Sequence, residues 1–110
     1  MTHEDLLARL DALGQDNEAV AETLRSRGIK GVPGEDHICP VANYLREVLP
    51  KGAVITVDGS SVTAADQEGP RTVTTPGPVA HFIECFDNGE FADLQATTLD
   101  DRLKIGGGNP

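Results

Sequence analysis

Both cysteines and two of the three histidines are the residues whose types and spacing could support chemistry in this chain. His37 and Cys39 are two positions apart, and His81 and Cys85 are four positions apart. Two cysteines and two histidines suit a tetrahedral zinc ion, so these four residues are the candidate metal ligands. The His-x-Cys spacing departs from the paired cysteines that are usual in structural zinc sites. The main expectation is therefore a chain without a cofactor, and zinc is the alternative.

Cys39 suggests a second kind of chemistry, because it precedes Pro40 at the expected start of a helix. The backbone N–H groups and the dipole at a helix N-terminus stabilise a thiolate. With His37 two residues away, Cys39 is a candidate nucleophile or redox sensor. The alternative is a small cysteine that only packs at a helix start, and no third orienting group is identifiable in the sequence.

Three helices are expected in the first half of the chain. Thr2 and Asp5 have the spacing of a capping box, and leucines at helical spacing predict a helix over residues 3–13 that ends at Gly14. Asp16 or Asn17 caps a second helix that ends at Gly28. A loop rich in Gly and Pro covers 29–38, and a third helix runs from Pro40 to Pro50.

Three short strands and a fourth helix are expected in the second half. The predicted strands are 53–57, 60–65 and 71–75, with a hairpin signal at 58–59 and a turn at 66–70. The fourth helix begins at Pro78 and ends at Gly89, and residues 91–94 add a short turn. This order predicts an α+β fold: three N-terminal helices, a three-stranded antiparallel meander, and a C-terminal helix packed on the sheet. Residues 1–105 form one domain and 106–110 a flexible tail.

The periodicity of the fourth helix predicts the directions in which the side chains of two candidate ligands, His81 and Cys85, point. Its apolar stripe contains Val79, Phe82 and Phe86. At about 100° per residue, His81 points about 150° and Cys85 about 110° away from the centre of that stripe. Both side chains are thus expected to lean outward, which disfavours a zinc ion inside the fold.

The third and fourth helices begin with similar sequences. Residues 40–49 are PVANYLREVL, and residues 78–87 are PVAHFIECFD. Shared helix-start residues and a shared apolar stripe explain the similarity, and a duplicated packing unit is the other interpretation. Together with Phe86–Gly89, these segments make residues 5–94 resemble small uncharacterised proteins of high-GC actinobacteria and their phages. That resemblance implies no activity.

Charge and composition exclude several classes of protein. The net charge is −9, with −4 in residues 1–50 and −5 in 51–110, and there is no basic patch for nucleic acid or anionic lipid. The three helices and hairpin suggest a winged-helix reader, but the third helix carries only Arg46 as a base. An acidic start without an apolar run predicts no signal peptide, hence a cytoplasmic protein with reduced thiols.

No complete catalytic or cofactor-binding motif is present. Acidic residues three apart at 84, 87, 90 and 93 fit a solvated face better than a calcium loop. We therefore expect a small acidic, non-enzymatic interaction or regulatory domain that binds a protein through the third helix and its neighbouring loops, with a homodimer left open. The alternatives are a zinc-binding or thiol-based sensor that uses His37, Cys39, His81 and Cys85, and a virion or assembly component.

Overall fold

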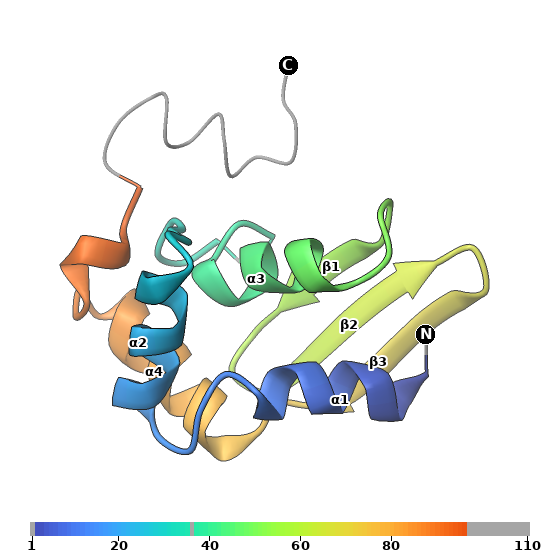
Figure 1. Ribbon diagram of the computed structural model, residues 1–110, viewed down its shortest axis with the longest axis horizontal. Coiled ribbons are helices and arrows are strands. Elements are labelled where there is room, and N and C mark those ends of the chain that lie inside the picture. The colour runs from blue at the N-terminus through green and yellow to red at the C-terminus, as the bar shows by residue number, and fades with distance from the viewer. Residues whose placement is uncertain (1, 36, 97–110) are drawn as a thin grey trace.

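The computed structural model describes residues 2–35 and 37–96, which form helices and one antiparallel sheet (Figure 1). The α+β arrangement predicted from the sequence, with three helices, a meander and then a helix, is confirmed. The predicted tail at 106–110 lies outside the described residues. The elements are α1 (His3–Asp11), α2 (Asn17–Ser26), α3 (Pro40–Val48), β1 (Val54–Val57), β2 (Ser61–Asp66), β3 (Gly69–Thr74), α4 (Gly77–Asp87) and the 3₁₀ turn η1 (Ala92–Leu94).

The first two helices begin at side-chain caps, as predicted. The Thr2 hydroxyl accepts the Asp5 N–H at 3.1 Å, and the Asp5 carboxylate accepts the Thr2 N–H at 3.0 Å. This reciprocal pair satisfies two backbone donors that the helix itself leaves unpaired. Asp16 caps α2 by accepting the Ala19 N–H at 2.8 Å. The chain direction at both helix starts is thus fixed by local hydrogen bonds.

The sheet is a meander with the strand order β1–β2–β3. The hairpin predicted at 58–59 is present, and the Asp58 carboxylate accepts the N–H groups of Ser60 and Ser61, each at 2.7 Å. The second turn is tighter than predicted, because Asp66 pairs directly with Gly69 and the strands leave only two residues between them. β3 therefore begins two residues earlier than the predicted 71.

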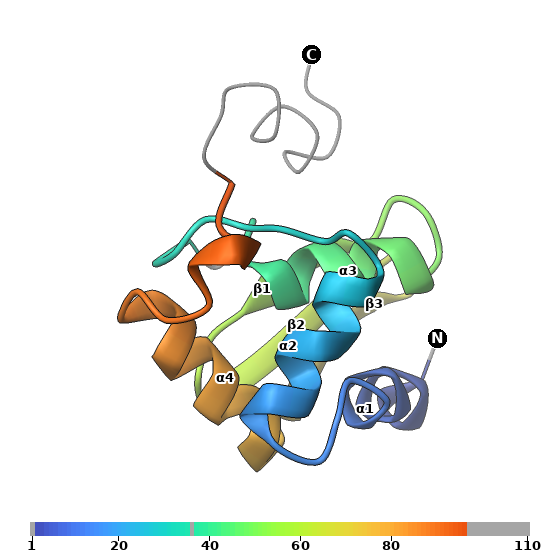
Figure 2. The same cartoon turned by 60° about the vertical axis from the view of Figure 1, so that its left-hand side comes forward.

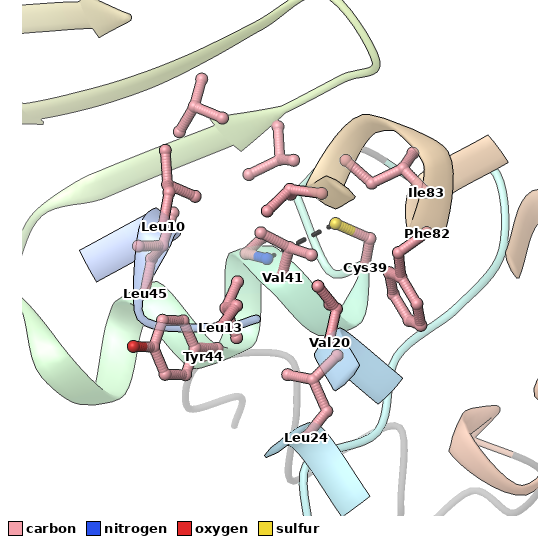
Figure 3. Close-up of a cluster of buried hydrophobic side chains, with 14 of the residues drawn as sticks. Leu10, Leu13, Val20, Leu24, Cys39, Val41, Tyr44, Leu45, Phe82 and Ile83 are labelled. Atoms are coloured by element: carbon pink, nitrogen blue, oxygen red, sulfur yellow. Dashed lines mark hydrogen bonds between the residues drawn. The ribbon is translucent and has the colours of Figure 1, made fainter. Parts of the chain in front are cut away.

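Helices cover one face of this sheet, and no helix of the described residues covers the other face, which we call the open face. α1 lies along β3, α3 lies along β1, and α2 packs against α4 beside them (Figures 1 and 2). Ile55, Val57, Val62 and Ala64 point from the strands into the core that the helices complete. All but two of the buried apolar residues form one cluster, part of which is drawn in Figure 3.

α3 is the most buried helix of the fold, although the sequence led us to expect a binding surface on it and its neighbouring loops; that expectation stays a prediction. Every residue from Pro40 to Leu45 is buried. The Asn43 amide donates to the Lys30 carbonyl at 2.8 Å, and the Tyr44 hydroxyl donates to the Arg9 carbonyl at 3.0 Å. A helix that contacts the sheet and both N-terminal helices leaves little side-chain surface for a partner.

α4 begins at Gly77, one residue before the predicted Pro78, and ends before Gly89 as predicted. It packs mainly on α2, and its other side lies near the β1–β2 hairpin. Among the described residues, no helix is long and apolar enough to cross a membrane.

Candidate functional site

Cys39 occupies the N-cap of α3, as the sequence predicted, but its environment opposes a reactive thiol. Its Sγ accepts the Ala42 N–H at 3.4 Å and lies among Val41, Phe82 and Ile83 (Figure 3). Burial raises the pKa of the Cys39 thiol from 9.0 to about 11, and this outweighs the lowering by the N–H groups of α3. The expectation of a stabilised thiolate at Cys39 is therefore wrong, because desolvation exceeds the effect of the helix terminus.

The raised pKa gives a direct prediction for Cys39. Its pKa in the folded protein is about 11, against 9.0 when exposed, so the thiolate fraction at pH 8 is about 100-fold lower in the folded state. We expect iodoacetamide to modify native Cys39 at least about 100-fold more slowly than in urea, as measured by mass spectrometry after digestion. Equal rates in the two states would contradict the burial argument.

Cys85 also lies inside the fold, which corrects the predicted outward orientation. Only 8% of it is exposed, and the Asn17 amide points its Nδ2 at Sγ at a distance of 3.7 Å. α2 packs against this flank of α4, so the helix has a second buried side beyond its apolar stripe. Burial, followed by the hydrogen bond with Glu90, raises the pKa of Cys85.

The two histidines lie on the surface at different places. His37 is exposed in the loop before α3, and its Nδ1 lies 3.4 Å from the Ile55 carbonyl oxygen. His81 is exposed on α4 and lines a hollow with Gly59 and Ser60 at the β1–β2 hairpin. Within residues 2–35 and 37–96, no group of three or more His, Cys, Asp or Glu side chains could hold a metal ion. Both cysteines are free, and zinc binding by these four residues stays the untested alternative to a chain without a cofactor.

Two of the acidic residues spaced three apart, Asp87 and Asp93, connect neighbouring elements of the fold. Asp87 accepts the Gly34 N–H at 2.8 Å and so ties α4 to the loop after α2. Asp93 accepts from Arg25 at 2.5 Å, and this hydrogen bond lowers the pKa of Asp93. A separate hollow of about 680 Å³, between α1 and the end of α3, contains one acid and one base, Asp5 and Arg9. Asp5 is already engaged in the α1 cap, so this hollow offers no acid–base pair.

Comparison with protein-family models, with curated proteins and with solved structures finds no match. The resemblance to actinobacterial and phage proteins therefore stays a prediction.

The open face of the sheet is the most distinctive surface of the described residues. The register places Thr56, Thr63 and Thr72 side by side across the three strands. The hydroxyls of Thr63 and Thr72 are 2.9 Å apart and hydrogen-bonded. Together with their strand neighbours they form what we call the threonine face: Val54, Thr56, Ser61, Thr63, Ala65, Pro70, Thr72 and Thr74.

The threonine face carries no charge in a chain whose net charge is −9. Val54 is 62% exposed there, the larger exposure of the two exposed large hydrophobic residues in the described part of the chain. Hydroxyl, methyl and β-branched groups dominate this surface, and charged groups are depleted from the centres of protein interfaces. The absence of charge is thus the feature that this face shares with the centre of an interface, although it has no aromatic side chain.

The two edges of the sheet differ in how they are protected. At β1, the register points the backbone groups of Ile55 and Val57 away from β2, but both residues are at most 2% exposed, and His37 lies against the Ile55 carbonyl. At β3, the backbone groups of Thr72 and Thr74 point away from β2 and both residues are exposed. Among residues 2–35 and 37–96, β1 is therefore a covered edge, whereas no strand pairs with the outer side of β3, which we call the free edge.

The sequence contained a signal for this surface that motif searching does not detect. Along each strand, the residues that alternate with the core residues and point to the other face are uncharged, and four of them are threonine. Motifs for metal sites and nucleophiles consist of His, Cys and carboxylate residues. A search for such motifs therefore does not find a surface made of hydroxyl and methyl groups. The side of the sheet that the helices cover also had to be known before the open face could be identified.

Proposed function

We propose that this chain is a non-enzymatic protein-interaction or regulatory domain that binds its protein partner through the threonine face. The observation that carries the proposal is the uncharged, helix-free face of a sheet on a strongly acidic chain. Acidic residues on every helix keep the remaining surface well hydrated. A partner that approaches the threonine face desolvates hydroxyls and methyl groups, which costs less than desolvating carboxylates.

The rigidity of the face supports the same proposal. Its three strands are joined by hairpins closed by Asp58 and Asp66, and its inner side is fixed by the core. Binding to a preformed surface requires little ordering, so more of the contact energy appears as affinity. Small hydroxyl side chains on strands also lose less rotamer freedom than lysine or glutamate would.

Site-specific photo-crosslinking in the source cells tests this function. A benzophenone amino acid at Thr63, at the centre of the face, should capture a discrete protein. The same group at Glu18, exposed on α2, is the matched control and should not capture it. Equal capture from Glu18 would contradict a binding role for the threonine face.

Substitution with the purified partner then gives a magnitude. Thr63→Arg places a long cation in the centre of the face, and we expect the dissociation constant to rise at least about 10-fold, equivalent to about 1.4 kcal/mol. The unfolding free energy should fall by only about 1 kcal/mol, because the substitution leaves the core untouched and removes one hydrogen bond, that to Thr72. Calorimetry measures the first quantity and urea denaturation the second, and unchanged affinity would exclude Thr63 from the interface.

A further inference from the structure

The sequence of β3 and its flanks is nearly the same when read from either end. Residues 69–77 are GPRTVTTPG, with Val73 at the centre and only Arg71 and Thr75 unlike each other. Antiparallel pairing about a two-fold axis also reverses the order of one strand. When a second copy of this segment is paired in this way, Thr72 of one copy lies opposite Thr74 of the other, and Pro70 lies opposite Pro76.

We infer that β3 pairs with β3 of a second copy of this chain, in antiparallel register about Val73, to give one continuous six-stranded sheet. This inference extends the proposed function, because the pairing joins two threonine faces into a single surface on the same side of the sheet. The evidence for the pairing is the geometry of the β3 edge. This evidence does not depend on whether the threonine face binds another protein.

The backbone groups at the free edge match this register. The cross-strand hydrogen bond from the Thr75 N–H to the Ser60 carbonyl, at 3.1 Å, fixes which β3 residues face β2. Thr72 and Thr74 alternate with those residues, so their N–H and C=O groups face outward. In the two-fold arrangement, Thr72 of one copy lies opposite Thr74 of the other. The N–H of each residue donates to the carbonyl of the residue opposite it.

Prolines delimit the paired segment. Pro70 and Pro76 have no N–H, so no backbone donor is left without an acceptor where the pairing ends. Because Pro70 of one copy meets Pro76 of the other, both ends of the pairing are delimited in the same way.

The side chains support the pairing on both faces of the sheet. On the open face, Thr72 of one copy lies opposite Thr74 of the other, and cross-strand threonine pairs are favourable. On the inner face, Val73 meets Val73 of the second copy next to the core against which it already packs. The only β3 cation is Arg71, whose guanidinium donates to the Glu68 carboxylate at 3.2 Å.

The exposure of Leu7 is an independent observation that favours a second surface packed against this edge. It is 39% exposed on α1, the helix that lies along β3 (Figure 1). Arg9 and Ala12 line the hollow toward the end of α3. At about 100° per residue, Leu7 lies on the opposite flank of α1, away from α3 and toward the free edge of β3. A second copy paired with β3 covers this leucine.

Charge distinguishes a second copy from a basic partner. Two chains of net charge −9 repel each other, and the outward-facing residues at which they meet, Pro70, Thr72, Thr74 and Pro76, are uncharged. Salt screens the repulsion between the remaining surfaces, with a Debye length of about 8 Å at physiological ionic strength. Self-association through β3 should therefore strengthen as salt rises, whereas binding of a basic partner weakens.

Sedimentation velocity of the full chain tests the inference, over roughly 10 µM to 1 mM because small interfaces are weak. We expect the 11.6 kDa monomer to convert to a dimer with rising concentration, and more completely in 0.5 M than in 0.05 M salt, a range over which screening increases several-fold. Thr74→Pro removes an outward N–H that β2 does not use, and Leu7→Asp charges the covered flank of α1. Each should weaken the dimer at least about 10-fold, which is about 1.4 kcal/mol.

Thr56→Lys is the matched control, since it changes the same open face at the opposite edge and should leave the dimer intact. Circular dichroism checks that every variant folds. A monomer at all concentrations and both salts, or a dimer that survives Thr74→Pro and Leu7→Asp, overturns the inference. If the chain is monomeric but Thr63→Arg abolishes partner binding, the inference alone fails. If the dimer behaves as expected and Thr63→Arg binds normally, the proposed function alone fails.

Discussion

Phe82→Ala should lower the unfolding free energy by about 3–5 kcal/mol, the cost of removing a fully buried aromatic ring. Phe82 is 0% exposed and stacks on both other phenylalanines of the chain. Its ring centroid lies 5.8 Å from that of Phe86 and 5.3 Å from that of Phe91. The substitution thus removes the shared member of both ring pairs and leaves a cavity between α4 and the core.

This loss is large against the total stability of a small domain, about 5–15 kcal/mol. Urea denaturation followed by circular dichroism measures it, with His81→Ala as the control. His81 is exposed on the same helix, so its replacement should change stability by only about 0.5 kcal/mol. A change below about 1 kcal/mol for Phe82→Ala would contradict the placement of this ring at the centre of the core.

Gly31→Ala should cost about 3 kcal/mol, the upper part of the range for inserting atoms into a packed site. A Cβ at this position would lie 2.3 Å from the Pro40 nitrogen and 2.6 Å from the Cys39 carbonyl carbon. Those atoms belong to the start of α3, which cannot shift without disturbing the most buried helix.

Gly31 also holds the last described segment in place. Its N–H donates to the Leu94 carbonyl and its carbonyl accepts the Ala96 N–H, each at 2.9 Å. We therefore expect Gly31→Ala to lower the midpoint of thermal unfolding as well as the unfolding free energy. Gly59→Ala is the control, because nothing lies within 4 Å of its Cβ position. Equal effects of the two substitutions would show that the close approach to Pro40 is not maintained.

Local sequence signals predicted the element boundaries well. The Thr2–Asp5 capping box, the Asp16 cap, Pro40 at the start of α3 and the Asp58 hairpin all form as expected. Each depends on residues within a few positions of one another, so the sequence alone contains the interaction. α1 nevertheless ends at Asp11 and not at 13, although Leu13 stays in the core as part of the turn to α2.

The environment of each candidate residue depended on contacts between distant elements. Cys85 is buried because α2 covers a flank of α4 that no helical periodicity marks as inner. Cys39 has a raised pKa because Phe82 and Ile83 exclude water from a helix N-terminus that by itself favours the thiolate. The threonine face could be identified only after the helices were placed on the other side of the sheet.

The most direct test of the central claim, that the open face and free edge of the sheet are the interaction surface, is amide hydrogen exchange of the chain at roughly 10 µM and 1 mM, a range suited to weak interfaces. We predict slower exchange at Thr72 and Thr74 in the concentrated sample. The amides of Ile55 and Val57, already covered at the other edge, should not change. Slowing confined to the outer surfaces of α2 and α4, with Thr72 and Thr74 unchanged, would contradict the account.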